Sequence, residues 1–508
     1  MEQNHLLTYL LLTPVAGSLI VLLLKEEKPK AIRWFTFAVS LLTFVISLVI
    51  YSKFDKSVSG FQFQDKIVWV KSLNISYFVG IDGVSLLLIL LTTFLTPLTL
   101  LSSWKAIDRK VKMFSFMMLF LETGMVGVFM SLDMFLFYVF WEAMLIPMYF
   151  IIGIWGGEQR IYASVKFFIY TMFGSLLMLV AIIWLAVYAS NSLGSFTTNL
   201  LDLYKVGPNV PQQIQKWMFF AFLLSFAIKV PIFPLHTWLP DAHVQAPTAG
   251  SVILAGVLLK MGTYGILRFC LPLFPQSSVN FAPFISILAV VGIIYGALVA
   301  MVQPDMKKLV AYSSVSHLGF VVLGIFAMTE EAVQGAVIQM INHGLSTGAL
   351  FLLVGIIYER THSREISYYG GIAKIIPIYS AVLMIVSLSS IGLPGLNGFV
   401  GEFLILLGSF KSTVLNSWWF TIFATSGVIF AAVYLLWMYQ RVVFGEVKNS
   451  ELNNKLYDMT ARELIVLIPI LIFIVWIGIY PSTFLEVTKL SSESILKSVG
   501  SFTFNLLK

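Results

Sequence analysis

Apolar runs of about twenty residues recur from one end of this chain to the other. A run of that length is long enough to cross a lipid bilayer as a single α-helix. The composition agrees, because 58% of the 508 residues are hydrophobic and only 11% are charged, whereas soluble domains carry about a quarter of charged residues. The sequence therefore predicts an all-α integral membrane protein rather than a set of soluble domains.

The apolar runs predict about 14 membrane spans. Their expected limits are 6–24, 31–51, 84–103, 113–131, 134–155, 163–190, 216–245, 247–270, 283–303, 307–328, 332–358, 375–410, 417–445 and 463–480. The first run lacks both a basic segment before it and a cleavage site after it, so we expect a retained span and not a signal peptide.

The polar parts of the sequence exclude several kinds of function. The longest connection, 52–82, is too short for a soluble domain that could hold a nucleotide or a flavin. Cys270 is the only cysteine, which excludes disulfides, iron–sulfur clusters and thiolate metal sites within this chain. The net charge of +7 is typical of basic loops that set membrane topology, so we expect no nucleic-acid partner.

Basic residues gather in alternate connections of the chain. The connections after the odd-numbered spans hold 19 of the 32 lysines and arginines, the other connections and the termini hold 11, and Lys229 and Lys260 lie within spans. Basic loops tend to remain in the cytoplasm. The pattern predicts that the odd-numbered loops are cytoplasmic and that both termini lie on the outer side of the membrane.

Two predicted spans contain prolines in their interior. The seventh contains Pro231 and Pro234, and the twelfth contains Pro394 among glycines. Proline removes a backbone donor and clashes with the preceding turn, so both spans are expected to be broken. They lie five spans apart and run in opposite predicted directions, as in an inverted repeat. We therefore predict two inverted five-helix repeats, spans 4–8 and spans 9–13, with ordinary kinks as the alternative.

Four ionisable side chains fall within or beside these spans, namely Glu142, Lys229, Lys260 and Glu402. Such groups are costly at membrane depth and need a partner or water. Static ion pairs that hold helices together are one interpretation, but buried pairs often contribute little net stability. A desolvated lysine releases its proton more readily, and a nearby carboxylate opposes that release. The four residues therefore predict a proton path.

The energies involved make such a path workable. A Glu–Lys pair about 6 Å apart attracts by roughly 3 kcal/mol at an effective dielectric constant near 20. Moving one proton against about 150 mV costs roughly 3.5 kcal/mol. Because the two energies are comparable, opening or closing one ion pair can drive most of one transfer.

Two histidines, His317 and His343, fall on the tenth and eleventh predicted spans. Imidazole titrates in the range that suits a proton relay, and the flanking hydroxyl groups can hold water. A neutral histidine that only hydrogen-bonds between helices is the alternative. Their place in the sequence between Lys260 and Glu402 favours the relay.

Other polar residues in the spans give weaker signals. Glu122 lies within a span and has no evident partner in the sequence, while Asp133 suits a helix cap. Asp241 and His243 follow the broken seventh span, and we expect them to line a cytoplasmic mouth.

The segments around these residues resemble the antiporter-like membrane subunits of complex I. The matching motifs are Trp141-Glu142 through Pro147, Lys229-Val-Pro-Ile-Phe-Pro-Leu-His-Thr-Trp-Leu-Pro-Asp-Ala-His243, Leu258-Leu-Lys260-Met-Gly-Thr-Tyr-Gly265, Tyr312-Ser-Ser-Val-Ser-His317 and Leu393-Pro-Gly-Leu-Asn-Gly-Phe-Val-Gly-Glu402. The resemblance extends from Gly80 to Phe444. Glu402 is similar to the residue of the M-type (chain 4) members, whereas the L and N members usually have lysine at this position.

The resemblance implies a role for each site residue. Glu142 and Lys229 would form a coupling ion pair, Lys260 the central relay, His317 and His343 the bridge, and Glu402 the terminal proton site. It also implies four regions: 1–112 with spans 1–3, 113–274 and 275–446 as the two repeats, and 447–508 with the last span and a tail.

The resemblance further implies a proton-translocating subunit of NADH:quinone oxidoreductase in a bacterial inner membrane. L-like and N-like subunits would be its neighbours, and FMN, iron–sulfur clusters and quinone would be bound by other chains, with no cofactor or metal on this one. A subunit of a multi-component Na⁺/H⁺ antiporter or of a membrane-bound hydrogenase is the alternative, because those proteins share most of the motifs.

Overall fold

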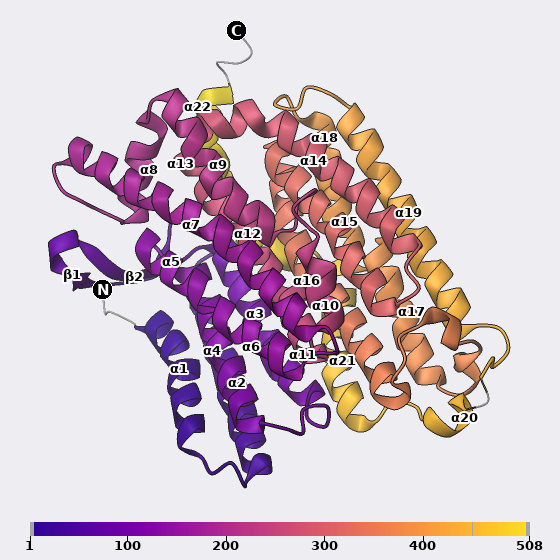
Figure 1. Cartoon of the computed structure of the whole chain (residues 1–508). Coiled ribbons are helices and arrows are strands. Elements are labelled where there is room, and N and C mark those ends of the chain that lie inside the picture. The colour runs from indigo at the N-terminus through magenta and orange to yellow at the C-terminus, as the bar shows by residue number, and fades with distance from the viewer. Residues whose placement is uncertain (1–4, 450, 504–508) are drawn as a thin grey trace.

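Long apolar helices make up almost all of the computed structural model, which describes residues 5–449 and 451–503 (Figure 1). Within these residues, 12 helical segments are long and apolar enough to cross a membrane. They are α1 (Leu6–Leu23), α2 (Pro29–Lys53), α3 (Gly83–Ser102), α4 (Val111–Met130), α5 with α6 (Met134–Ala143 and Leu145–Trp155), α7 (Arg160–Leu193), α11 to α13 (Thr248–Leu273), α14 (Pro275–Met301), α15 (Met306–Ala327), α16 (Glu330–Thr361), α19 (Trp419–Val443) and α21 (Ala461–Ile479). The predicted class, an all-α membrane protein, is confirmed.

Two further apolar segments are interrupted where the sequence has proline. The first consists of α9 (Gln212–Lys229) and α10 (Trp238–Gln245), and the second of α17 (Pro377–Ile391) and α18 (Asn397–Lys411). In the second, Gly392 ends α17 in the left-handed region with φ of +85°, a conformation that glycine adopts without a steric penalty. The total of fourteen spans and the inverted repeats remain predictions.

The segment from Thr248 to Leu273 is helical but irregular. Its α-helical parts α11 (Thr248–Ile253), α12 (Leu259–Gly265) and α13 (Leu271–Leu273) alternate with two π-helical turns, η3 (Leu254–Leu258) and η4 (Ile266–Cys270). Every residue in its most apolar stretch of 18 residues is buried inside the protein. Because π-helical turns are often found at functional sites, this segment is the natural centre of a site.

The connections separate into two groups at opposite ends of the helices. Those after odd-numbered spans contact one another, since Gly157 N donates to Gln245 O and Asp305 pairs with Glu365 in a β-bridge. The other group is joined by bridges between Val79 and Ser131 and between Asp133 and Asn199. The loops that the charge pattern grouped together therefore do lie together. Which group faces the cytoplasm remains a prediction.

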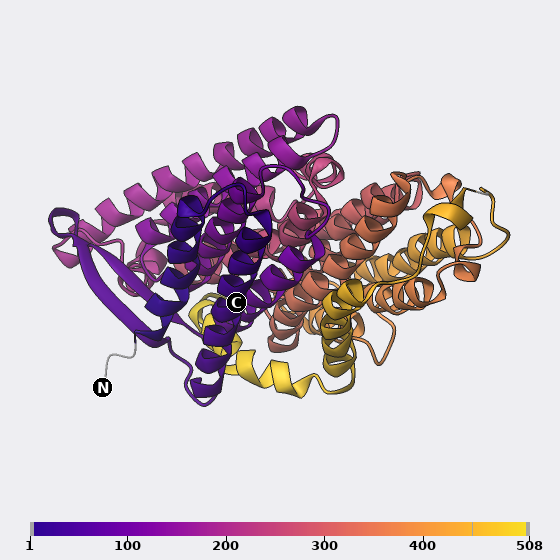
Figure 2. The ribbon, with the colours of Figure 1, turned by 90° about the horizontal axis from the view of Figure 1, so that it is seen from below.

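Two elements outside the spans were not predicted. Strands β1 (Gln62–Val70) and β2 (Ile75–Ile81) form an antiparallel hairpin within the long polar connection. Helix α22 (Ser482–Thr503) follows the last span and runs from the C-terminal half toward the N-terminal half (Figure 2). It contacts the start of α3, where Gly83 N donates to Ser491 Oγ at 2.9 Å.

The remaining short elements lie in connections. They are α8 (Leu200–Val206), α20 (Leu452–Lys455), and the 3₁₀ turns η1 (Lys71–Leu73), η2 (Gly207–Asn209), η5 (Ile366–Tyr368) and η6 (Ile372–Lys374).

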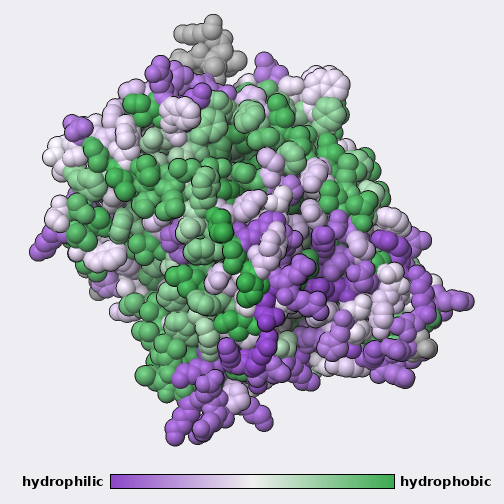
Figure 3. Space-filling model, in the orientation of Figure 1, coloured by the Kyte–Doolittle hydropathy of each residue, from purple (hydrophilic) through white to green (hydrophobic). Residues whose placement is uncertain are grey.

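The outer surface is apolar over broad areas. Figure 3 shows hydrophobic side chains over much of one face, with hydrophilic ones gathered near its lower edge and in a band that reaches toward the centre. Exposed side chains such as Phe173 and Val180 of α7 and Ile429 of α19 suit contact with lipid tails.

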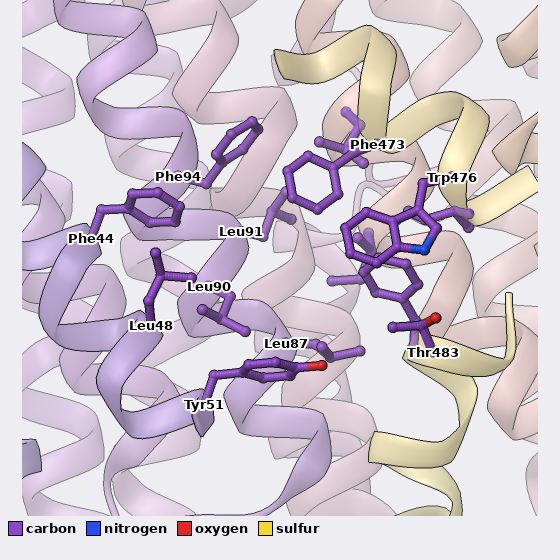
Figure 4. A pocket seen from close by; sticks show the side chains of 14 residues that line it. Phe44, Leu48, Tyr51, Leu87, Leu90, Leu91, Phe94, Phe473, Trp476 and Thr483 are labelled. Carbon is purple, nitrogen blue, oxygen red and sulfur yellow. The ribbon is translucent and has the colours of Figure 1, made fainter. Parts of the chain in front are cut away.

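One apolar cavity, of about 180 Å³, lies among α2, α3, α16 and α21 (Figure 4). It is lined by Phe44, Leu91, Phe473, Trp476 and ten further residues, none of which carries a carboxylate, an amine or an imidazole. The ionisable groups of the interior lie elsewhere.

A buried ion pair joins the irregular segment to the N-terminal helices. Arg268 Nη2 lies 2.6 Å from Asp82 Oδ2, and the two side chains are only 4% and 5% exposed. Asp82 also caps α3, because its other carboxylate oxygen accepts from Ser85 N. The pair therefore fixes the position of the irregular segment relative to α3.

The substitution Asp82→Asn should destabilise the fold, because it leaves Arg268 buried without a counter-charge. We expect a loss of about 3–5 kcal/mol, seen as a lower midpoint of heat denaturation of the detergent-purified protein. Glu451→Gln is the matched control, since it breaks an exposed pair with Lys455 and should change the midpoint little. Equal effects of the two substitutions would contradict this account.

Candidate functional site: a buried line of ionisable side chains

Four of the six predicted site residues lie together in the interior. Lys260 Nζ lies 2.6 Å from His343 Nδ1, and His317 Nδ1 lies 3.0 Å from Glu402 Oε1. The two histidine rings lie edge to face, with 6.1 Å between their centroids. None of these four side chains is more than 4% exposed. The structure thus places them in the order Lys260, His343, His317, Glu402.

Each of these residues comes from a different helix. Lys260 lies on α12, directly after the π-helical turn η3, and its Nζ also donates to the carbonyl of Ala255 within that turn. His343 lies on α16, His317 on α15 and Glu402 on α18, just after the break in the second interrupted segment. The line therefore depends on tertiary packing and on both irregular features of the backbone.

The contact between Lys260 and His343 can hold one exchangeable proton. A hydrogen bond between two nitrogens needs an acceptor, so His343 Nδ1 is unprotonated when the lysine donates. His343 Nε2 has no hydrogen-bond partner among the described residues. The proton can therefore move along the bond and leave from the far side of the imidazole ring.

Glu402 is held directly by groups on two other helices, and a third helix supports one of these groups. Its Oε1 accepts from Gln339 Nε2 of α16 at 3.2 Å as well as from His317. The other ring nitrogen of His317 lies 3.2 Å from the hydroxyl of Tyr434 on α19. These contacts orient the carboxylate toward His317 and so favour proton exchange between the two.

A small polar cavity lies beside the two histidines. It measures about 10 Å³ and is lined by His317, His343, Asn342, Ser346 and further polar residues. Such a volume is close to the minimum that one water molecule needs. One water molecule here would bridge the two rings by hydrogen bonds.

Glu142 and Lys229, the expected coupling ion pair, do not form a direct salt bridge in the described part of the chain. The charge of each nonetheless acts on the other. Glu142 is only partly buried, because α5 lies at the edge of the single chain. Lys229 Nζ is buried near the ring of Trp141, 5.2 Å from its centroid. The structure therefore shows an open pair, with Ser175 acting on the carboxylate of Glu142.

The structure places the other acidic residues singled out in the sequence in three different settings. Asp133 caps α5 by accepting hydrogen bonds from the backbone N–H groups of Phe135 and Leu136, as the sequence predicted. Asp241 pairs with Lys166 at 2.6 Å at the end of the first interrupted segment. Glu122 is fully buried on α4 and takes no part in the line from Lys260 to Glu402.

A polar cavity of about 630 Å³ opens among the connections after odd-numbered spans. Its lining includes Glu158, Ala246, Asp305, Lys307 and Arg364. Lys307 is nearly buried and donates to the carbonyl of Ala246. Behind this wall, the buried ring of His243 stacks on Phe351 at 4.5 Å. Neither of the residues expected at a cytoplasmic mouth, Asp241 and His243, is among those that line this cavity.

Sequence reasoning missed Gln339, Tyr434 and Lys307. Gln339 lies one helical turn before His343, so its spacing could have placed it on the same face of the helix. Lys307 lies at the very start of α15 (Met306–Ala327), where nothing in the sequence indicated that its side chain turns inward to the carbonyl of Ala246. Tyr434 has no local signal, because it reaches His317 only through tertiary packing.

No cluster of metal ligands was found among residues 5–449 and 451–503. The buried groups are a lysine, two histidines and a carboxylate in series, and their shared chemistry is proton exchange. Together, the fold and the site define a polytopic membrane protein with an internal line of ionisable side chains.

Comparison with known proteins identifies the family. Residues 131–433 match the family described as NADH:quinone oxidoreductase/Mrp antiporter, TM, and residues 7–128 match the amino terminus of NADH-ubiquinone oxidoreductase chain 4. The chain belongs to the subunit M (chain 4) family of NADH:quinone oxidoreductases.

Relatives match along almost the whole chain. NADH-quinone oxidoreductase subunit M of Rhodobacter capsulatus is 46% identical over 99% of this chain and 98% of that protein. NADH-ubiquinone oxidoreductase chain 4 of Arabidopsis thaliana is 43% identical over 97% of each. A chain of respiratory complex I from Thermus thermophilus is 31% identical, with a TM-score of 0.87 over 97% of this chain and all of that one.

More distant structures share the fold alone. A chain of the Mrp complex from Dietzia sp. DQ12-45-1b is 16% identical, with a TM-score of 0.84 over 99% of each chain. The antiporter alternative is therefore the more distant of the two predicted assignments.

The substitution Gly401→Ala should disturb Glu402 through its neighbour. The added methyl group would overlap the side chain of Gln339, which is one of the two hydrogen-bond donors to Glu402. We expect a loss of about 1–3 kcal/mol from overpacking, measured as a lower midpoint of heat denaturation. Gly60→Ala is the control, because no atom lies within 4 Å of its added methyl group. An unchanged midpoint for Gly401→Ala would contradict the packing described here.

Proposed function

We propose that this chain translocates protons through Lys260, His343, His317 and Glu402, as a membrane subunit of NADH:quinone oxidoreductase. The observation that carries the proposal is the unbroken order of these residues through the interior, with two hydrogen bonds and one ring-to-ring step. The redox chemistry is assigned to other chains of the complex, where FMN, iron–sulfur clusters and quinone would be bound.

In each step, a proton moves from one nitrogen or oxygen atom to another. The ammonium of Lys260 gives a proton to His343 Nδ1, and His343 releases another from Nε2 toward the small polar cavity. His317 takes up a proton there and passes one to the carboxylate of Glu402. The series ends with a neutral Glu402, from which the proton can leave.

The open pair of Glu142 and Lys229 supplies the driving step in this proposal. A Glu–Lys pair about 6 Å apart attracts by roughly 3 kcal/mol at an effective dielectric constant near 20, so a change in its separation involves an energy comparable to the roughly 3.5 kcal/mol needed to move one proton against about 150 mV. The partial exposure of Glu142 supports a position where an adjacent subunit can influence the pair.

The setting of the chain follows from the same proposal. We assign it to a bacterial inner membrane, beside L-like and N-like subunits, with both termini on the outer side. The cavity of about 630 Å³ then lies on the cytoplasmic side. The two inverted five-helix repeats, residues 113–274 and 275–446, would each contribute one interrupted segment.

Substitution of the residue at either end of the line, Lys260 or Glu402, should uncouple NADH oxidation from proton pumping. In inverted membrane vesicles, Lys260→Ala and Glu402→Gln should lower the number of protons pumped per NADH oxidised, because each deletes an obligatory proton carrier. Lys411→Ala is the control on the same helix as Glu402, since Lys411 forms only a surface pair with Glu331. Normal pumping by both variants in assembled complex would refute the proposed function.

The proposed orientation can be read by cysteine labelling. The only native cysteine, Cys270, is buried, whereas Glu158 and Ser57 are exposed on opposite groups of connections. A membrane-impermeant maleimide should label Glu158→Cys in inverted vesicles and Ser57→Cys in intact spheroplasts. The reverse labelling would show that the orientation is inverted.

A further inference from the structure

Glu122 is a buried carboxyl group that the proposed relay does not use. Its side chain is 0% exposed, and neither carboxyl oxygen makes a hydrogen bond of normal geometry within the described residues. A carboxylate in such a place is unstable unless it is paired, so a buried carboxyl without a cation takes up a proton. The geometry therefore indicates a neutral acid at Glu122.

The nearest polar side chain accommodates that proton. Helix α3 packs against α4, and the Thr96 hydroxyl of α3 is the neighbouring side-chain group that acts electrostatically on the Glu122 carboxyl. Thr96 already donates its own hydrogen to the carbonyl of Thr92 at 2.9 Å, so its oxygen is free to accept. The O–H of a protonated Glu122 can therefore point at Thr96.

A row of hydroxyl groups leads away from this contact. Thr96, Thr99 and Ser103 follow one another at intervals of three and four residues, so they share one face of α3. The Thr99 hydroxyl is buried, with no hydrogen-bond partner found in the described part of the chain. On α4, Ser115 lies seven residues before Glu122, again on one face. We name these residues, Thr96, Thr99, Ser103 and Ser115, the hydroxyl seam.

The seam ends at a second small cavity. About 20 Å³ in volume, it is lined by Ser103 and Ser115 together with Arg33, Thr36 and others. That is enough space for one water molecule, and the lining supplies several polar partners for it. The cavity lies where α3 ends and α4 begins, which is the end with the connections after odd-numbered spans.

A face of α3 next to the seam packs against the segments of the central relay. Leu95 packs against Gly256 and Leu91 against Gly344, beside the segments that carry Lys260 and His343. One apolar layer therefore separates Glu122 from the relay. A change of charge at Glu122 would act on the Lys260–His343 pair through a medium of low dielectric constant.

We propose that Glu122 is a further proton-binding site of this chain, loaded from the odd-loop end through the hydroxyl seam and separate from Glu142 and Lys229. In the loading step, a protonated water in the cavity gives a proton to the seam, each hydroxyl accepts one proton and passes on its own, and Thr96 gives one to the Glu122 carboxylate, so that one O–H bond breaks for each one that forms. Release reverses these steps. The inference rests on the proposed function, because a stored proton matters only in a chain that moves protons.

Variants that block the seam test this site in the assembled complex. Glu122→Gln keeps the shape but cannot release a proton, and Thr99→Val removes a hydroxyl from the seam. Both should lower the protons pumped per NADH by the same fraction, and the double variant should lose no more than either single one. Glu122→Asp, which keeps the acid, should retain more pumping than Glu122→Gln.

Thr93→Val is the matched control for Thr99→Val. Thr93 is also buried on α3, one turn before Thr96, but its hydroxyl is hydrogen-bonded to Ser47 of α2 and lies beyond the Glu122 end of the seam, so pumping should remain at the wild-type level. The infrared spectrum distinguishes the loss of a proton-binding group from a change in packing, because Glu122→Gln should remove one protonated-carboxyl band.

Two results would overturn the inference. One is wild-type pumping by Glu122→Gln while Lys260→Ala is defective, which leaves the proposed function intact. The other is an unchanged infrared carboxyl band in Glu122→Gln. Normal pumping by Lys260→Ala as well would refute the proposed function itself, so the two failures can be told apart. If Glu122→Gln does not assemble, Thr99→Val against Thr93→Val decides the matter.

Discussion

An ionisable side chain persists inside a membrane protein only where another polar group or water satisfies it. The contact between Lys260 and His343, with Nζ and Nδ1 2.6 Å apart, meets that requirement at the centre of this chain. The contact needs a π-helical turn next to Lys260, a neighbouring helix that carries His343, and several surrounding helices that exclude lipid. Much of the architecture can be understood as the enclosure of this one pair.

The same constraint explains the other buried polar groups. Arg268 and Asp82 satisfy each other and hold the irregular segment against α3. Glu402 is satisfied by His317 and Gln339, and the glycines around it let α16 and α18 approach closely. Static pairs thus frame the groups to which we assign proton exchange.

The sequence predicted what depends on local chemistry. Hydropathy marked the spans, proline marked the two interruptions, and charge at membrane depth selected Lys260 and Glu402. The hairpin of β1 and β2 and helix α22 were missed, because neither is apolar enough to give a span signal. The π-helical turns have no residue signature, and Tyr434 reaches His317 only through packing that local patterns do not contain. Glu142 was expected to be buried but is partly exposed. The burial of a residue on the outer side of α5 depends on what packs against this chain, which the sequence of the chain does not contain.

The claim at the centre of this account is that His343 carries protons between Lys260 and the Glu402 end. The most direct test is the number of protons translocated per electron by the assembled complex with His343→Phe, which keeps a ring of similar shape but removes both nitrogens. The account predicts a lower ratio in a complex that still assembles and still oxidises NADH. A wild-type ratio in that variant would contradict it.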